Sequence, residues 1–195
     1  MSERPRTKPP EQRRDELMSA ALKLFVDQGV AATTIEQITV GADIAKGTFY
    51  LHFSSKEDLL AALRRRFARD LLRRIETAVA IEAEADWRAK LAAWAGAAAA
   101  FYLDSTPHHD VLFAETRPRS REGLVDNILV DHLSTLLRDG VNAQAWSADD
   151  PRFTAIFLFS GLHGIVDAAA RQKPVERGVW TASLRQAFFK TVGLA

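Results

Sequence analysis

Polar and basic side chains recur between residues 33 and 56 at positions that suit contact with a nucleic acid. Thr33 and Thr34 place hydroxyls and unpaired backbone N–H groups at the expected start of a helix, a place that attracts phosphate. Side chains able to reach base edges or phosphates follow at or near the next expected helix: Lys46, Thr48, Tyr50 and His52. Together these residues predict contacts with both the backbone and the bases of DNA.

Lys56 lies in the first turn of a long helix that the sequence predicts over about residues 55–79. A capping box of Ser54 and Glu57 is expected to start this helix. A cation so close to a helix N-terminus is unfavourable against the helix dipole. An external anion would explain the lysine, so Lys56 is a predicted phosphate contact.

Two short helices joined by a tight turn would present these side chains to a DNA groove. The spacing of apolar residues predicts a first helix over about residues 11–28. Two shorter helices are expected over about residues 35–41 and 45–51, and Thr34 with Gln37 makes a capping box for the first of them. This arrangement is typical of a helix-turn-helix, whose second helix enters the major groove.

The rest of the chain also has the pattern of helices, and no sustained alternation of apolar and polar residues predicts a strand. Further helices are expected over about residues 87–103, 108–116, 121–141, 152–171 and 178–192. The predicted fold class is therefore all-α, with about nine helices. We expect a basic arm and a three-helix helix-turn-helix module in residues 1–55, and a helical ligand-binding and dimerisation domain in residues 56–195.

Composition and charge narrow the class of protein. There is no cysteine, which excludes disulfides and Cys-based zinc sites and fits the reducing cytoplasm. Residues 1–74 carry 14 Lys and Arg against 10 Asp and Glu, whereas residues 75–195 carry 12 against 15, so the N-terminal part would bind a polyanion. The best candidate for a membrane span, residues 153–170, is interrupted by three polar residues, and no membrane partner is expected.

The stretch that carries the polar residues resembles the DNA-binding region of the TetR family of repressors. The resemblance rests on matching positions in the same order and spacing: Phe25, Gly29, Thr33, Thr34, residues 46–53 (KGTFYLHF) and residues 56–60 (KEDLL). It covers about residues 11–60, and beyond them only length and helical layout match. The order of a dozen positions makes this motif specific.

The resemblance implies roles for individual residues. It implies that Thr34, Tyr50 and Lys56 hold phosphates. It also implies that four residues face the groove or its walls: Lys46, Gly47, Thr48 and His52. Two positions depart from the family pattern, because Asp43 stands where the turn usually has glycine and Gly41 stands where a helical polar residue is usual. Asp tolerates the left-handed conformation less well than glycine, so the angle of the recognition helix is affected.

The larger domain is expected to join two subunits and to bind an effector. A lone helix-turn-helix reads only a few base pairs, so a homodimer is expected. Small residues on one late helix and an apolar stripe on the last helix predict its interface: Ser160, Gly161, Gly164, Ala168, Trp180, Leu184, Ala187 and Phe188. The predicted lining of the effector pocket is Trp94, Phe101, Phe113, Phe157 and His163.

These interpretations predict a cytoplasmic, sequence-specific regulator of transcription that binds double-stranded operator DNA, a repressor that a small apolar or amphipathic effector releases. The alternative is a ligand-independent DNA-binding protein of the same fold. An enzyme that uses the helical cavity and a helical dimer with no DNA role are two further classes, the last disfavoured by residues 46–56. Residues 104–110 contain Ser, His and Asp, but closeness in sequence does not make a triad, and no catalytic residue, metal or cofactor is expected.

Overall fold

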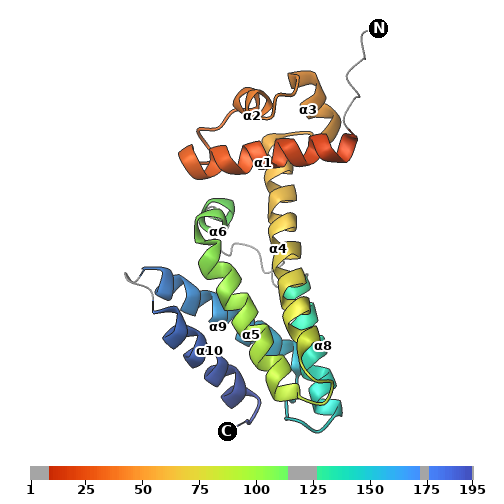
Figure 1. Cartoon of the computed structure of the whole chain (residues 1–195), viewed down its shortest axis with the longest axis vertical. Helices are drawn as coiled ribbons and strands as arrows, with labels where there is room; N and C mark the ends of the chain where they lie inside the picture. The colour runs from red at the N-terminus through yellow and green to blue at the C-terminus, as the bar shows by residue number, and fades with distance from the viewer. Residues whose placement is uncertain (1–8, 114–126, 172–175, 195) are drawn as a thin grey trace. The chain divides into compact units, whose positions relative to one another are not determined.

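The computed structural model describes residues 9–113, 127–171 and 176–194 (Figure 1). Within these ranges the chain forms nine helices and no strand, which confirms the all-α class. The helices are α1 (Pro10–Gln28), α2 (Ile35–Gly41), α3 (Lys46–His52), α4 (Lys56–Ile81), α5 (Trp87–Asp104), α6 (Thr106–Phe113), α8 (Ile128–Asn142), α9 (Pro151–Arg171) and α10 (Arg177–Thr191). Most of the arm and the helix ends expected at 114–116 and 121–126 lie outside the described residues.

The chain divides into two compact units. The first consists of Met1–Arg66 and Pro107–Glu115, and the second of Phe67–Thr106 and Thr116–Ala195. The single helix α4 begins in the first unit and ends in the second. Within the first unit, the Nε of Arg64 on α4 donates a hydrogen bond to the carbonyl oxygen of Leu112 on α6 at 2.7 Å. A cation thereby meets the negative end of α6. A functional boundary at residue 55 stays a prediction.

The core of the first unit is built on the amphipathic helix α1. Its buried residues recur at helical spacing: Leu17, Met18, Ala21 and Phe25. Helix α2 packs against α1 and α3 packs against α2, and Ile38 of α2 and Phe49 of α3 are also fully buried. Gly29 ends α1 at φ +83°, and its N–H donates to the carbonyl oxygen of Phe25 at 2.9 Å. Glycine adopts this conformation without the strain that a Cβ brings, so α1 stops here.

The core of the second unit is made of large aromatic and aliphatic side chains. Helix α5 packs against α9 and α10, and α8 packs against α9 (Figure 1). The rings of Trp94 on α5 and Phe188 on α10 stack with their centroids 6.0 Å apart. The indole of Trp146 lies over Gly140 of α8, and its Nε1 donates to the carbonyl oxygen of Leu137 at 2.9 Å. This hydrogen bond satisfies the polar atom of a buried tryptophan.

The start of α4 differs by one residue from the prediction. Ser55, not Ser54, caps the helix, because its Oγ accepts a hydrogen bond from the Asp58 N–H at 3.0 Å. The Asp58 carboxylate in turn accepts from the Ser54 N–H at 3.1 Å. The predicted pair of Ser54 and Glu57 is therefore wrong. Neighbouring serines and neighbouring acids give two pairs at the same spacing, and local pattern alone does not choose between them.

Helix α9 is long and apolar enough to cross a membrane by length and composition alone, against the expectation from its polar residues. Only one of the three interrupting residues, Asp167, is an acid or a strong base, so the helix passes a test of composition. That the protein has no membrane partner stays a prediction. Of the apolar stretch of α9, 33% is buried. Core helices of soluble proteins can have the same length and composition. The exposed side of α9 carries Phe153, Phe157, Ser160, Gly161, Gly164, Asp167, Ala168 and Arg171. This outer face of α9 is largely apolar.

Candidate DNA-binding surface and sensor sites

Thr34 fixes the start of α2 by the predicted capping box. Its Oγ1 accepts from the Gln37 N–H at 3.2 Å, and its own N–H donates to Gln37 Oε1 at 2.8 Å. Gln28 at the end of α1 also donates to Gln37 Oε1, at 3.1 Å. Thr34 remains exposed at the positive end of a short helix. The prediction of this box is confirmed, and the phosphate contact of Thr34 stays a prediction.

Thr33 is placed differently from its neighbour. It is 1% exposed, and its hydroxyl donates to the carbonyl oxygen of Gly29 at 2.8 Å. The same hydroxyl accepts from Gln28 Nε2 at 3.2 Å, and the Thr33 N–H donates to the Val30 carbonyl oxygen at 3.3 Å. Its polar groups therefore serve the loop between α1 and α2, which leaves no donor for the phosphate contact that the sequence predicted.

Lys56 is held by the same loop. Its ammonium donates to the carbonyl oxygens of Val30 at 2.7 Å and Thr33 at 2.8 Å. These carbonyl oxygens stabilise a cation that the dipole of α4 disfavours, so an external anion is not needed to explain it. Sequence reasoning missed this role because the partners lie 23 and 26 residues earlier in the chain.

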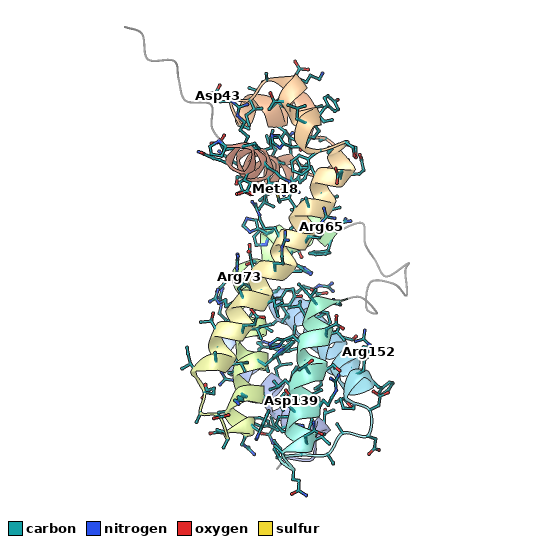
Figure 2. The ribbon with its side chains drawn as sticks, turned by 90° about the vertical axis from the view of Figure 1, so that its right-hand side faces the viewer. Met18, Asp43, Arg65, Arg73, Asp139 and Arg152 are labelled. Carbon is teal, nitrogen blue, oxygen red and sulfur yellow. The ribbon has the colours of Figure 1, made fainter. Side chains whose placement is uncertain are left out.

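The turn between α2 and α3 contains Asp43 in a left-handed conformation, at φ +53° (Figure 2). The Asp43 N–H donates to the Val40 carbonyl oxygen at 3.1 Å, and the Ile44 N–H donates to the Thr39 carbonyl oxygen at 2.9 Å. This is the hydrogen-bond pattern of a Schellman motif. The chain keeps the turn of the motif even though Asp replaces the usual glycine.

One side of α3 is buried and the other side is exposed. The ring of Phe49 is buried, with centroid distances of 5.8 Å to Phe53 and 5.4 Å to Tyr50. The guanidinium of Arg14 on α1 lies 4.8 Å from the centroid of the Phe53 ring and covers it. The structure exposes Lys46, Gly47 and Tyr50 on α3 and leaves Thr48 and His52 half-buried. These five predicted residues thus share one short helix whose position is set by Phe49 and Phe53.

Sequence reasoning missed two apolar residues on this module. Leu51 of α3 is 80% exposed and Val40 at the end of α2 is 75% exposed. The helical spacing contained the signal, because Leu51 lies on the side of α3 opposite Phe49 and Phe53. An aliphatic side chain this exposed contributes little to the core.

The five residues predicted to line an effector pocket differ in their unit and in their burial. Phe113 belongs to the first unit, and the other four belong to the second. Trp94 is fully buried, whereas Phe157 is 59% exposed on the outer face of α9. Phe101 and His163 are half-buried. Helical spacing does not distinguish core, surface and cavity positions, and a pocket lined by all five residues stays a prediction.

His163 instead belongs to an aromatic group on α5 and α9. Its ring centroid lies 4.7 Å from Tyr102 and 4.5 Å from Phe159. Burial, and then the negative charge of Asp167, raise the pKa of Tyr102 above its usual value, so the hydroxyl stays protonated. This group has the character of a packed core with polar edges.

The second unit contains a cleft of about 420 Å³ between the end of α4, the start of α5 and α8. Its lining combines apolar and polar side chains: Val79, Ala80, Glu82, Glu84, Trp87, Lys90, His132, Thr135, Leu136 and Asp139. Trp94 Nε1 donates to His132 Nδ1 at 3.1 Å. Burial lowers the pKa of His132, while Glu76 opposes that shift. The cleft therefore has a neutral imidazole in its wall and acids at its exposed edge.

The residues predicted for a dimer interface fall into two groups. Ser160, Gly161, Gly164 and Ala168 all lie on the exposed outer face of α9. Ala187 on α10 is also exposed and Trp180 is half-buried, but Leu184 and Phe188 are each only 1% exposed within the single chain. Their assignment to an interface is corrected, since the apolar stripe of α10 packs on α5 of the same chain.

The described residues contain no cluster of three or more His, Asp or Glu side chains able to hold a metal ion. In the segment that joins α5 and α6, the Asp104 carboxylate pairs with Arg177 at 2.6 Å, and Ser105 caps α5. The Thr106 hydroxyl donates to the Tyr102 carbonyl oxygen at 3.1 Å. These side chains act as caps and ion pairs between helices.

Comparison with known proteins relates the first unit to a family of regulators. Residues 17–63 match the family model described as bacterial regulatory proteins, tetR family. The HTH-type transcriptional repressor KstR2 of Mycolicibacterium smegmatis is 43% identical over 58 residues, which are 30% of this chain. The match spans only 28% of the length of KstR2.

Solved structures extend the similarity to the whole fold. A bacterial regulatory protein in the tetR family from Rhodococcus RHA1 superposes with a TM-score of 0.68 at 20% identity, covering 94% of this chain and 98% of that one. The fatty acid degradation regulator FadR from Bacillus halodurans superposes with a TM-score of 0.72 at 18% identity, covering 97% and 98%. At such identities the superpositions establish the helical fold of both units.

Proposed function

Because this chain belongs to the TetR family of bacterial regulatory proteins, we propose that it is a cytoplasmic transcription regulator that binds double-stranded operator DNA. The observation that carries the proposal is the exposed side of α3, which presents Lys46, Gly47 and Tyr50 on a helix anchored by the buried Phe49. A short helix with this pattern fits the major groove, where lysine reads guanine and a hydroxyl reaches phosphate. Thr34, Thr48 and His52 flank this surface in the proposal.

Selection from a library of random DNA duplexes tests this function. The wild-type chain should enrich one sequence, and Lys46→Ala should change the preferred base or weaken the binding of that sequence at least about tenfold. Tyr50→Phe should weaken binding to all duplexes alike, because it removes a phosphate contact. Lys190→Ala, on the exposed side of α10, is the matched control. Equal recovery of all duplexes by the wild-type chain would refute DNA recognition.

The proposed assembly is a homodimer through the outer face of α9. Gly161 and Gly164 have open space where a Cβ would lie, and Phe153 and Phe157 extend the same exposed face. Small residues on an apolar helix let a second helix approach closely, and two copies would form an isologous contact. A dimer also supplies two reading heads for half-sites about 34–36 Å apart.

Sedimentation measures this assembly directly. Gly164→Trp should place a large side chain on the contact and produce monomers with much weaker operator binding. Gly178→Trp is the control, since Gly178 lies on α10 and also has open space around it. A Gly164→Trp variant that still sediments as a dimer would place the interface elsewhere.

The proposed regulation is repression that a small amphipathic effector relieves by binding in the cleft of the second unit. Its volume, about 420 Å³, lies in the range of small-molecule sites, and Trp87 and Leu136 supply apolar wall beside the acids. The single helix α4 connects the cleft residue Val79 to the first unit along the chain. In this proposal residues 56–195 sense the effector and residues 1–55 read DNA.

A compound screen separates this proposal from a ligand-independent DNA-binding protein. Thr135 lies on the exposed edge of the cleft, so Thr135→Trp should fill it without disturbing the core. A compound that releases operator DNA from the wild type should fail to release it from Thr135→Trp. Arg138→Trp, exposed on the same helix but outside the lining, should respond as the wild type does. An effector that acts equally on both variants would exclude the cleft.

A further inference from the structure

Leu51 is the most exposed large hydrophobic residue in the described part of the chain. It is 80% exposed, and it lies on the helix that the proposed function places in the major groove. The fold does not need its side chain, because α3 is held by Phe49 and Phe53 on the opposite side. An aliphatic group at this place adds no charge or hydrogen bond to DNA binding, so any contribution must come from apolar contact.

Gly47 lies one helical turn before Leu51 and on the same side of α3. A Cβ at Gly47 would have no atom within 4 Å, so the packing of the protein does not require glycine there. Gly47 and Leu51 together form an apolar ridge on α3, which is low at Gly47, where there is no side chain, and high at Leu51. Lys46 and Tyr50 are exposed along one edge of this ridge. Polar groups able to bind phosphate and base edges thus flank an apolar strip.

We propose that Leu51 reads the 5-methyl group of a thymine, and that Gly47 leaves room for the base edge to approach the helix backbone. Thymine is the natural DNA base that presents a methyl group in the major groove, and apolar side chains select it by contact with that methyl. Gly47 and Leu51 lie beside the polar residues of the proposed DNA surface on the same short helix. The molecule that contacts them is therefore DNA. This inference rests on the proposed function and adds a specificity-determining residue to it.

Replacement of single thymines by uracil tests the inference, because uracil differs from thymine only by the missing methyl. The probe is the duplex that the wild-type chain enriches from the random library. Uracil at the thymine facing Leu51 should weaken binding by about fourfold, the factor expected for burial of one methyl-sized group. In Leu51→Ala the thymine and uracil duplexes should bind within about 1.5-fold of each other, because the contacting group is absent.

Ile81→Ala is the matched control, since Ile81 is an equally exposed aliphatic residue, at 79%, at the end of α4. It should keep the fourfold preference for thymine. The role of Leu51 would be overturned if every thymine of the enriched sequence could be replaced by uracil without loss of binding, or if Leu51→Ala kept the preference for thymine. Either result would leave the proposed function standing. If the wild-type chain enriches no sequence, the proposed function falls and this inference falls with it.

Discussion

Different kinds of contact stand out inside each of the two units of this protein. In the first unit, polar side chains bind backbone groups of neighbouring turns, as Thr34 binds Gln37 and Lys56 binds the carbonyls before α2. In the second unit, aromatic rings fill the space between helices, as Trp94 does against Phe188. Hydrogen bonds fix direction, which suits a surface that must present side chains at defined angles, whereas ring packing tolerates many sequences of similar volume.

The match to the family model lies within the first unit, in agreement with this difference. Residues 17–63 contain the caps, the turn and the anchors of α3, each of which demands a particular residue type. The helices that follow demand apolar volume at helical spacing, which diverse residues satisfy. The tests below perturb one kind of contact at a time, in order of the expected loss of stability.

The largest effect is expected for Gly140→Ala in the second unit. A Cβ at Gly140 would overlap the ring of Trp146, whose own hydrogen bond to Leu137 opposes its displacement. We expect the free energy of unfolding to fall by about 2–3 kcal/mol, as for an overpacked core. Urea unfolding followed by tryptophan fluorescence measures it. Gly178→Ala, with open space around the glycine, should lose less than about 0.5 kcal/mol. Equal losses in the two variants would contradict tight ring packing.

A smaller loss is expected for Lys56→Met in the first unit, because the methionine keeps the stem and removes the ammonium. The two short charge-assisted hydrogen bonds and a longer one to the Ala31 carbonyl oxygen disappear, and the half-buried position limits the loss to about 1–2 kcal/mol. The salt dependence of DNA binding should stay unchanged if the ammonium serves only the loop. A lost phosphate contact would instead lower the slope of log K against log salt by about 0.9.

Lys46→Met is the contrasting variant, since Lys46 is exposed on α3. It should lower the salt slope and leave urea unfolding within about 0.5 kcal/mol of wild type. If Lys56→Met lowers the slope and preserves stability, the phosphate role predicted from the sequence is right and the loop contact is secondary.

The sequence predicted features whose cause lies within one helical turn. Thr34 and Gln37 are three residues apart, so their capping box follows from the chain itself. The partners of Lys56 lie more than 20 residues away and could not be read from local spacing. Leu184 and Phe188 show the remaining limit, because an apolar stripe has the same spacing whether it meets another subunit or α5 of its own chain.

Two left-handed residues allow a direct comparison of the units. Asp43 ends α2 at φ +53°, and Gln144 follows α8 at φ +58°. Asp adopts this conformation more readily than Gln, because its short side chain bonds locally. We expect Gln144→Gly to stabilise the protein by about 0.5–1 kcal/mol and Asp43→Gly by less than about 0.5 kcal/mol. Thermal unfolding of both variants gives the order, and a larger gain at Asp43 would show that its turn is strained.

The last test concerns the pH dependence that His132 gives to the second unit. Burial lowers its pKa in the folded state, although Glu76 opposes the shift, and its Nδ1 accepts the Trp94 hydrogen bond. The folded state therefore binds the proton less readily than the unfolded chain. The stability is fully present above the unfolded pKa, about 6.5, and is lost as the pH falls below it. In the protonated ring both nitrogens carry hydrogen, so the bond from Trp94 is also lost.

His132→Asn keeps an acceptor near the Trp94 indole and cannot be protonated in this range. Urea unfolding between pH 7.5 and pH 5 should show that the wild type loses more stability than this variant, by at most about 1.4 kcal/mol per pH unit. His108→Asn is the control, because it removes one exposed histidine of α6 and should change with pH as the wild type does. A wild type and a His132→Asn variant with parallel profiles would mean that the cleft wall accepts a proton without cost. The protonation of His132 would then have no effect on the stability of the second unit.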